Sequence, residues 1–235
     1  MGTYLNPGSW SFEMGLNSEI YVDKTEMIAF LNALVNTEQR YVSVSRTRRF
    51  GKTMAADMLC AYYGQSKRAR TLFEGTLLAA SEPTQTNGGE LAWDAYLGAF
   101  DVVRLSMTDF FRTGRAVGDG IDRMQRLVTR DVRMAYPDVD YFDEADLVQS
   151  LADVFAATGR QFVVVIDEWD AVFRAWQGDE AGQREFLDFL RDWLKDKPYV
   201  ALAYMTGILP IKKYGQHSAL NMFTEYSMNM LRAEC

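Results

Sequence analysis

The sequence predicts one three-layer α/β domain with a mostly parallel central sheet. The first observation is that strand-like runs alternate with helix-like runs along most of the 235 residues, which is typical of right-handed crossovers between parallel strands. The second is the apolar run Phe162–Ile166, because a strand with two apolar faces belongs in the middle of a parallel sheet. The third is a hydrophobic content of 48%, which is enough for one sizeable core.

The first 38 residues are expected to form a preamble to this core. Asn6-Pro7-Gly8 is a turn signal. The run Ile20–Val22 leads to Asp23, which can cap a helix over residues 25–35. We therefore expect an N-terminal preamble and helix over residues 1–38, and the core of the domain over residues 39–235.

The elements of the core follow from composition and periodicity. Short β-branched runs predict strands, and longer apolar or amphipathic runs predict helices. Residues 81–90 contain Pro83, Asn87 and two glycines, which predict a loop. The expected strands cover residues 41–45, 100–107, 161–166 and 199–206, and the expected helices cover 54–63, 117–135, 143–157 and 180–195.

A phosphate-binding loop is predicted between the first strand and the helix after it. Gly51-Lys52-Thr53 stands there, and in such loops backbone N–H groups surround the phosphates, the lysine neutralises the β and γ oxygens, and the hydroxyl binds Mg²⁺. The first glycine of the Walker A pattern is absent, because Arg46 lies five positions before Gly51. The alternative is a common tripeptide that only caps a helix.

The strand 161–166 ends in Asp167-Glu168, which has the form of a Walker B site. The aspartate of such a pair reaches the metal bound by the threonine, and the glutamate orients or deprotonates water. Asp167 lies 115 positions after Lys52, which leaves room for the strand 100–107 between the two motifs. Thr206, at the end of the next strand, can sense the γ-phosphate. The alternative is that the acidic residues are solvated and simply begin a loop.

These residues together resemble the AAA-ATPase-like family of bacterial and archaeal proteins, in which a C-terminal nuclease-like domain of the PD-(D/E)XK type is common. The family loop reads Arg-Pro-Arg-Arg-Phe-Gly-Lys-Ser, so Arg46 fits the family, whereas Thr47 and Thr53 replace its proline and serine. Trp169 replaces a tyrosine and is expected to pack rather than react. The resemblance rests on Tyr21–Thr25, Arg46–Thr53, Val164–Glu168, Thr206–Ile208 and Ser218–Asn221.

The resemblance implies a P-loop NTPase sandwich of the additional-strand type that uses ATP and Mg²⁺. Longer relatives continue into further helices, so the lid and the nuclease-like domain are expected to be absent from residues 1–235. The catalytic residues are then Glu168 and Lys52, and the metal ligands are Thr53 and Asp167. The expected nucleotide-binding residues are Arg48, Arg49, Phe50, Gly51, Lys52, Thr53 and Thr206.

Three functions remain open from the sequence. The first is a Mg²⁺-dependent ATPase, and the second is a non-hydrolysing nucleotide switch that controls a protein partner or a nuclease-like domain. The third is direct nucleic-acid binding through Arg48 and Arg49. The net charge of −7 opposes this third function over the whole surface, so any such contact must be local.

Other classes of function have little support in the sequence. His217 is the only histidine, so the sequence gives little support for a Ser-His-Asp triad or for a metal centre with histidine ligands. The two cysteines, Cys60 and Cys235, form no disulfide framework. The N-terminus lacks a signal-peptide pattern, and no run approaches the ~20 apolar residues needed to span a bilayer. We therefore expect a cytoplasmic protein.

Overall fold

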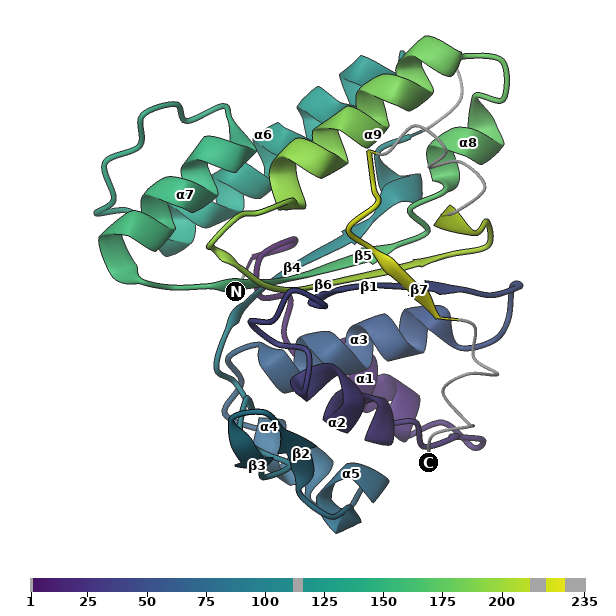
Figure 1. The fold of residues 1–235 in the computed structure, drawn as a ribbon, viewed down its shortest axis with the longest axis vertical. Helices are drawn as coiled ribbons and strands as arrows, with labels where there is room; N and C mark the ends of the chain where they lie inside the picture. Colours follow the sequence, from purple (N-terminus) through teal and green to yellow (C-terminus); the bar gives the residue numbers. More distant parts are fainter. Residues whose placement is uncertain (1, 112–115, 212–218, 227–235) are drawn as a thin grey trace.

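A computed structural model places a parallel sheet between two layers of helices (Figure 1). It describes residues 2–111, 116–211 and 219–226. In this part of the chain the sheet has five strands in the order β4-β5-β6-β1-β7, and every neighbouring pair is parallel. The predicted α/β sandwich is therefore confirmed. The strands are β1 (Tyr41–Ser45), β4 (Asp101–Ser106), β5 (Phe162–Asp167), β6 (Val200–Gly207) and β7 (Thr224–Tyr226).

Each face of the sheet is covered by its own helices and its own apolar cluster. Helices α6 (Val117–Ala135), α7 (Leu147–Thr158) and α9 (Glu180–Leu194) lie on one face, and α1 (Trp10–Leu16), α2 (Glu26–Asn32) and α3 (Lys52–Tyr63) lie on the other (Figure 1). Strand β5 is buried along its whole length, as its uninterrupted apolar sequence predicts. None of the helices in the described ranges is long and apolar enough to cross a membrane.

Short elements were not predicted, because tertiary contacts rather than periodicity stabilise them. The predicted loop 81–90 is wrong in part: it contains most of a hairpin of β2 (Thr84–Thr86) and β3 (Gly89–Leu91), in which Gly89 takes a φ of 112°. The expected helix over 25–35 is shortened to α2. The other unpredicted elements are α1, α4 (Ala69–Phe73), α5 (Leu77–Ala80), the 3₁₀ helix η1 (Met107–Asp109), α8 (Ala171–Ala175) and β7.

The strand that separates the two predicted motifs in space is β6. In the sheet order β6 lies between β1, which precedes the phosphate loop, and β5, which ends in the acidic pair. The strand between the motifs in sequence, β4, pairs with the far side of β5 instead. This arrangement brings the end of β6, with Thr206, between the two halves of the site.

The N-terminal preamble covers the outer edge of β4. The Asn6 backbone N–H donates to the Val102 carbonyl at 2.8 Å, and the Arg104 backbone N–H donates to the Tyr4 carbonyl at 2.8 Å. The Asn6 side chain also accepts a hydrogen bond from the Val102 N–H at 2.8 Å. These contacts satisfy the backbone groups of an edge strand that would otherwise be open to pairing.

Candidate nucleotide site

The loop between β1 and α3 turns sharply at two residues with positive φ. Arg49 has a φ of 69° and Gly51 a φ of 73°, and Gly51 is the N-cap of α3. Glycine adopts this left-handed conformation without steric cost. A Cβ atom on Gly51 would also lie 3.0 Å from the Lys24 Nζ atom. Both features favour glycine immediately before Lys52.

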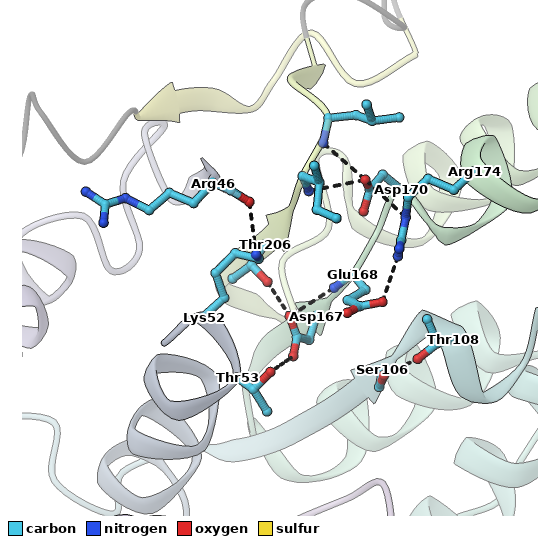
Figure 2. Close-up of polar contacts among 12 residues, drawn as sticks. Arg46, Lys52, Thr53, Ser106, Thr108, Asp167, Glu168, Asp170, Arg174 and Thr206 are labelled. Atoms are coloured by element: carbon cyan, nitrogen blue, oxygen red, sulfur yellow. Dashed lines mark hydrogen bonds and ion pairs between the residues drawn. The ribbon is translucent and has the colours of Figure 1, made fainter. Parts of the chain in front are cut away.

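The Lys52 ammonium is folded over the loop that precedes it (Figure 2). Its Nζ atom donates to the Arg46 carbonyl at 2.9 Å and to the Thr47 carbonyl at 3.0 Å. The Arg46 guanidinium itself stacks on the Phe50 ring, 5.3 Å from the ring centroid. The two hydrogen bonds of Lys52 thus connect the start of the loop to the N-terminus of α3.

Lys24 is a second ammonium at this loop that the sequence argument did not assign. Its Nζ atom donates to the Phe50 carbonyl at 3.0 Å. Burial lowers the pKa of Lys24, and the neighbouring Arg46 charge lowers it further. Asp23 anchors the segment by accepting from the Thr25 N–H at 2.8 Å and from the Leu77 N–H at 2.9 Å. The available signal was the Tyr21–Thr25 motif, which contributes to the family resemblance.

Asp167 is the centre of the polar contacts at the ends of the strands (Figure 2). It is buried, and its Oδ2 atom accepts from the Thr53 hydroxyl at 2.8 Å. Its Oδ1 atom accepts from the Thr206 hydroxyl and, at 3.0 Å, from the Glu168 N–H. Residues from α3, β5 and β6 therefore meet at one carboxylate.

Arg104 lies next to the Asp167 carboxylate, and the sequence did not predict it as a site residue. Its Nη2 atom is 3.5 Å from Asp167 Oδ2 and 3.4 Å from Asp57 Oδ1. Burial raises the pKa of Asp57, and the Arg104 charge and hydrogen bond oppose that increase. The available signal was a single cation within the otherwise apolar strand Val102–Leu105.

Glu168 is held by an arginine from the next short helix. The Arg174 Nη2 atom lies 2.6 Å from Glu168 Oε2, and the Arg174 Nε atom lies 3.4 Å from Asp170 Oδ2. Asp170 is fully buried and also accepts from the Ile208 and Leu209 N–H groups at 3.2 and 3.1 Å. Glu168 has a φ of 52°, a conformation that costs a non-glycine residue about 1–2 kcal/mol.

A cavity of about 370 Å³ opens beside the phosphate loop. Burial raises the pKa of Tyr21 at this cavity to about 12, and Asp23 adds to the effect, so the phenol is neutral at pH 7. The lining is largely apolar and comes from the preamble, the loop and α3: Ile20, Tyr21, Val22, Lys24, Arg49, Phe50, Gly51, Met54, Ala55 and Met58.

The expected site residues fall into two groups in space. Thr53, Asp167 and Thr206 are in direct contact, with Glu168 next to them in the chain. Arg48 and Arg49 are exposed on the loop, and neither forms an ion pair with another described residue. Trp169 is buried and packs edge-on against Phe173. Three other residues named from the sequence, His217, Ser218 and Cys235, lie outside the described residues.

The comparison with protein families agrees with this geometry. Residues 10–216 match the model of the AAA-ATPase-like family, which is described as a predicted AAA-ATPase. No curated protein matches the sequence. The family match covers most of the 235 residues, and it includes the phosphate loop, the acidic pair and Thr206. The chain therefore belongs to the AAA-ATPase-like family.

Proposed function

We propose that the chain binds ATP with Mg²⁺ at the edge of the sheet and hydrolyses it. The observation that carries the proposal is the 2.8 Å contact between the Thr53 hydroxyl and the Asp167 carboxylate. It joins the residue after the phosphate-loop lysine to the end of the buried strand β5, which is the pairing that a Mg²⁺-nucleotide site requires.

The phosphates are assigned to the N-terminus of α3, where backbone N–H groups and the helix dipole favour anions. Lys52 exchanges its two carbonyl partners for the β and γ oxygens. Arg48, Arg49 and Phe50 line the approach from the loop. Thr206, which donates to Asp167, lies next to the position of the γ-phosphate in this proposal.

The donor set fits Mg²⁺. This ion prefers oxygen ligands and is commonly held by one or two protein groups together with phosphates and water. The Thr53 hydroxyl and the Asp167 carboxylate supply two such oxygens. When bound, Mg²⁺ would neutralise negative charge on the β and γ phosphates.

The cavity beside the loop is assigned to the base and ribose of the nucleotide. Its volume of about 370 Å³ lies within the usual range for small-molecule pockets, which are mostly apolar with a few polar groups. Met54 and Met58 supply apolar contacts, and Lys24 supplies a hydrogen-bond donor. Residues before position 39 line part of this cavity. The proposed preamble 1–38 therefore contributes directly to the site of the proposed core 39–235.

The metal assignment predicts a specific effect of Thr53→Val. We expect ATP affinity in the presence of Mg²⁺ to fall about tenfold, to the level measured in EDTA, because the variant loses one metal ligand. Thr53→Ser keeps the hydroxyl and should retain the Mg²⁺ dependence. Fluorescence titration with a labelled ATP analogue measures both variants. Equal Mg²⁺ dependence in Thr53→Val and the wild type would remove Thr53 from the metal site.

A second function, a non-hydrolysing switch that controls a protein partner or a nuclease-like domain, is favoured by the ion pair between Glu168 and Arg174. An arginine 2.6 Å from the carboxylate occupies one of its oxygens, so that oxygen is not free to accept a proton from water. In this reading ATP binds and the protein changes shape, but turnover waits until Arg174 moves away.

The Arg174→Gln variant separates the two functions. If Arg174 restrains Glu168, we expect the steady-state ATPase rate to rise severalfold in the variant, because the carboxylate is released toward water. Arg191→Gln, which removes an arginine paired with Asp188 on the surface of α9, is the matched control and should leave the rate unchanged. No turnover by the wild type together with clear turnover by Arg174→Gln supports the switch, whereas equal turnover by both proteins supports the ATPase without such a restraint.

A further inference from the structure

A row of four arginines lies along helix α6. Arg123, Arg126, Arg130 and Arg133 are three, four and three residues apart in the sequence, which puts them on one side of an α-helix. All four side chains are exposed. We refer to these four residues as the arginine row.

The arginine row points away from the core. The opposite side of α6 carries buried residues, among them Ile121, Met124, Val128 and Val132, which pack into the apolar cluster shared with α7 and α9. At about 100° per residue, the two sets lie on roughly opposite sides of the helix. In Figure 1, α6 belongs to the helical layer on the face of the sheet away from α1, α2 and α3.

Three of the four arginines of the row form no close ion pair within the described residues. The Arg133 Nη1 atom pairs with Glu144 Oε2 at 2.7 Å, whereas the other three arginines form no ion pair with any carboxylate in the described part of the chain. Asp119 and Asp122 are exposed one turn before Arg123 and Arg126 on the same side of α6, and Asp119 lies in the first turn, where a carboxylate favours the helix dipole. Asp131 is turned to the preamble and accepts from the Tyr4 and Leu5 N–H groups.

We propose that the arginine row binds the phosphate backbone of a nucleic-acid duplex. The row extends over about 15 Å of helix, a length over which one strand of a duplex presents about four phosphates. Arginine suits this partner because its planar guanidinium donates two parallel hydrogen bonds to phosphate oxygens. The positions of the charges therefore match a regular polyanion.

The row fits an acidic protein less well. Protein interfaces depend on buried aromatic and aliphatic anchors at their centre. No large apolar side chain is exposed between Arg123 and Arg133, and the large apolar side chain of Met134 that α6 does expose lies beyond the last arginine. The net charge of −7 opposes nucleic-acid contact over the whole surface, so contact is expected to be local.

The test is salt-dependent binding to fluorescein-labelled 20-base-pair DNA and RNA duplexes of one sequence, measured by anisotropy without nucleotide. Four phosphate contacts predict a slope of log K against log salt of about −3.6, or about a 150-fold loss of affinity between 50 and 200 mM salt. Arg123→Gln/Arg126→Gln/Arg130→Gln should reduce the slope to about −1. The matched control, Lys67→Gln/Arg68→Gln/Arg70→Gln, removes three exposed cations from the region of α4 and should keep the wild-type slope.

Binding of either duplex through the row supports the proposal, and the tighter duplex identifies DNA or RNA as the source of the phosphates. Three results would overturn it: no duplex binding by the wild type at 50 mM salt, equal losses in the two triple variants, or displacement of the duplex by polyglutamate at equal charge concentration. Because ATP is left out, failure of this test is independent of the proposed ATPase. Thermal unfolding of both variants checks that the exposed substitutions leave the fold intact.

Discussion

Glu168→Gln is expected to lower the ATPase rate by about 10²–10⁴-fold while MgATP still binds. The amide keeps the size of the side chain but cannot accept a proton from water, and general-base catalysis contributes a factor of this order. The backbone at Glu168, with its φ of 52°, is not altered by the substitution. The Glu168 N–H can therefore still donate to Asp167.

Steady-state phosphate release and MgATP affinity must be measured on the same preparations of this variant. Glu185→Gln, which changes an exposed glutamate on α9, is the control for loss of one negative charge. A rate that is unchanged in Glu168→Gln would show that Glu168 is not the base. A loss of affinity together with rate would assign Glu168 to binding instead.

Asp167→Ala is expected to remove Mg²⁺-dependent ATP binding and to lower the free energy of unfolding by about 3 kcal/mol. The variant loses the metal ligand, and it also removes a buried acceptor for Thr53, Thr206 and the Glu168 N–H. Arg104, whose side chain is 13% exposed, then keeps Asp57 as its one carboxylate partner among the described residues.

Urea unfolding separates the structural part of this effect from the loss of the metal. Thr206→Val removes one hydrogen bond to Asp167 and leaves the carboxylate in place, so it should cost only about 1 kcal/mol. A full loss of Mg²⁺ dependence with little change in stability would contradict the role of Asp167 as the centre of the buried contacts. Retained Mg²⁺ dependence would place the metal elsewhere.

The parts of the fold that the sequence predicts are those in which local pattern and burial agree. The run Phe162–Ile166 is apolar without interruption, and it is the interior, fully buried strand β5. Strand β7 has only three residues, Thr224–Tyr226, and its strand character comes from pairing with β1 rather than from its own sequence. No local pattern could have predicted it.

The site shows the same division between local and long-range information. Thr53 and Asp167 belong to motifs with fixed spacing to a strand and a helix, so their meeting could be predicted. Lys24, Arg104 and Arg174 reach the site from segments distant in sequence or from a short helix. A lone cation gives no signal of its partner until the chain is folded.

The most direct test of the proposed function is a calorimetric titration of MgATP into the purified chain, with Lys52→Ala as its control. The proposal predicts saturable binding by the wild type and none by the variant, because the ammonium that now bonds the Arg46 and Thr47 carbonyls is the cation for the β and γ phosphates. Equal binding by both proteins, or no binding by the wild type, would contradict the proposal that this loop is a nucleotide site.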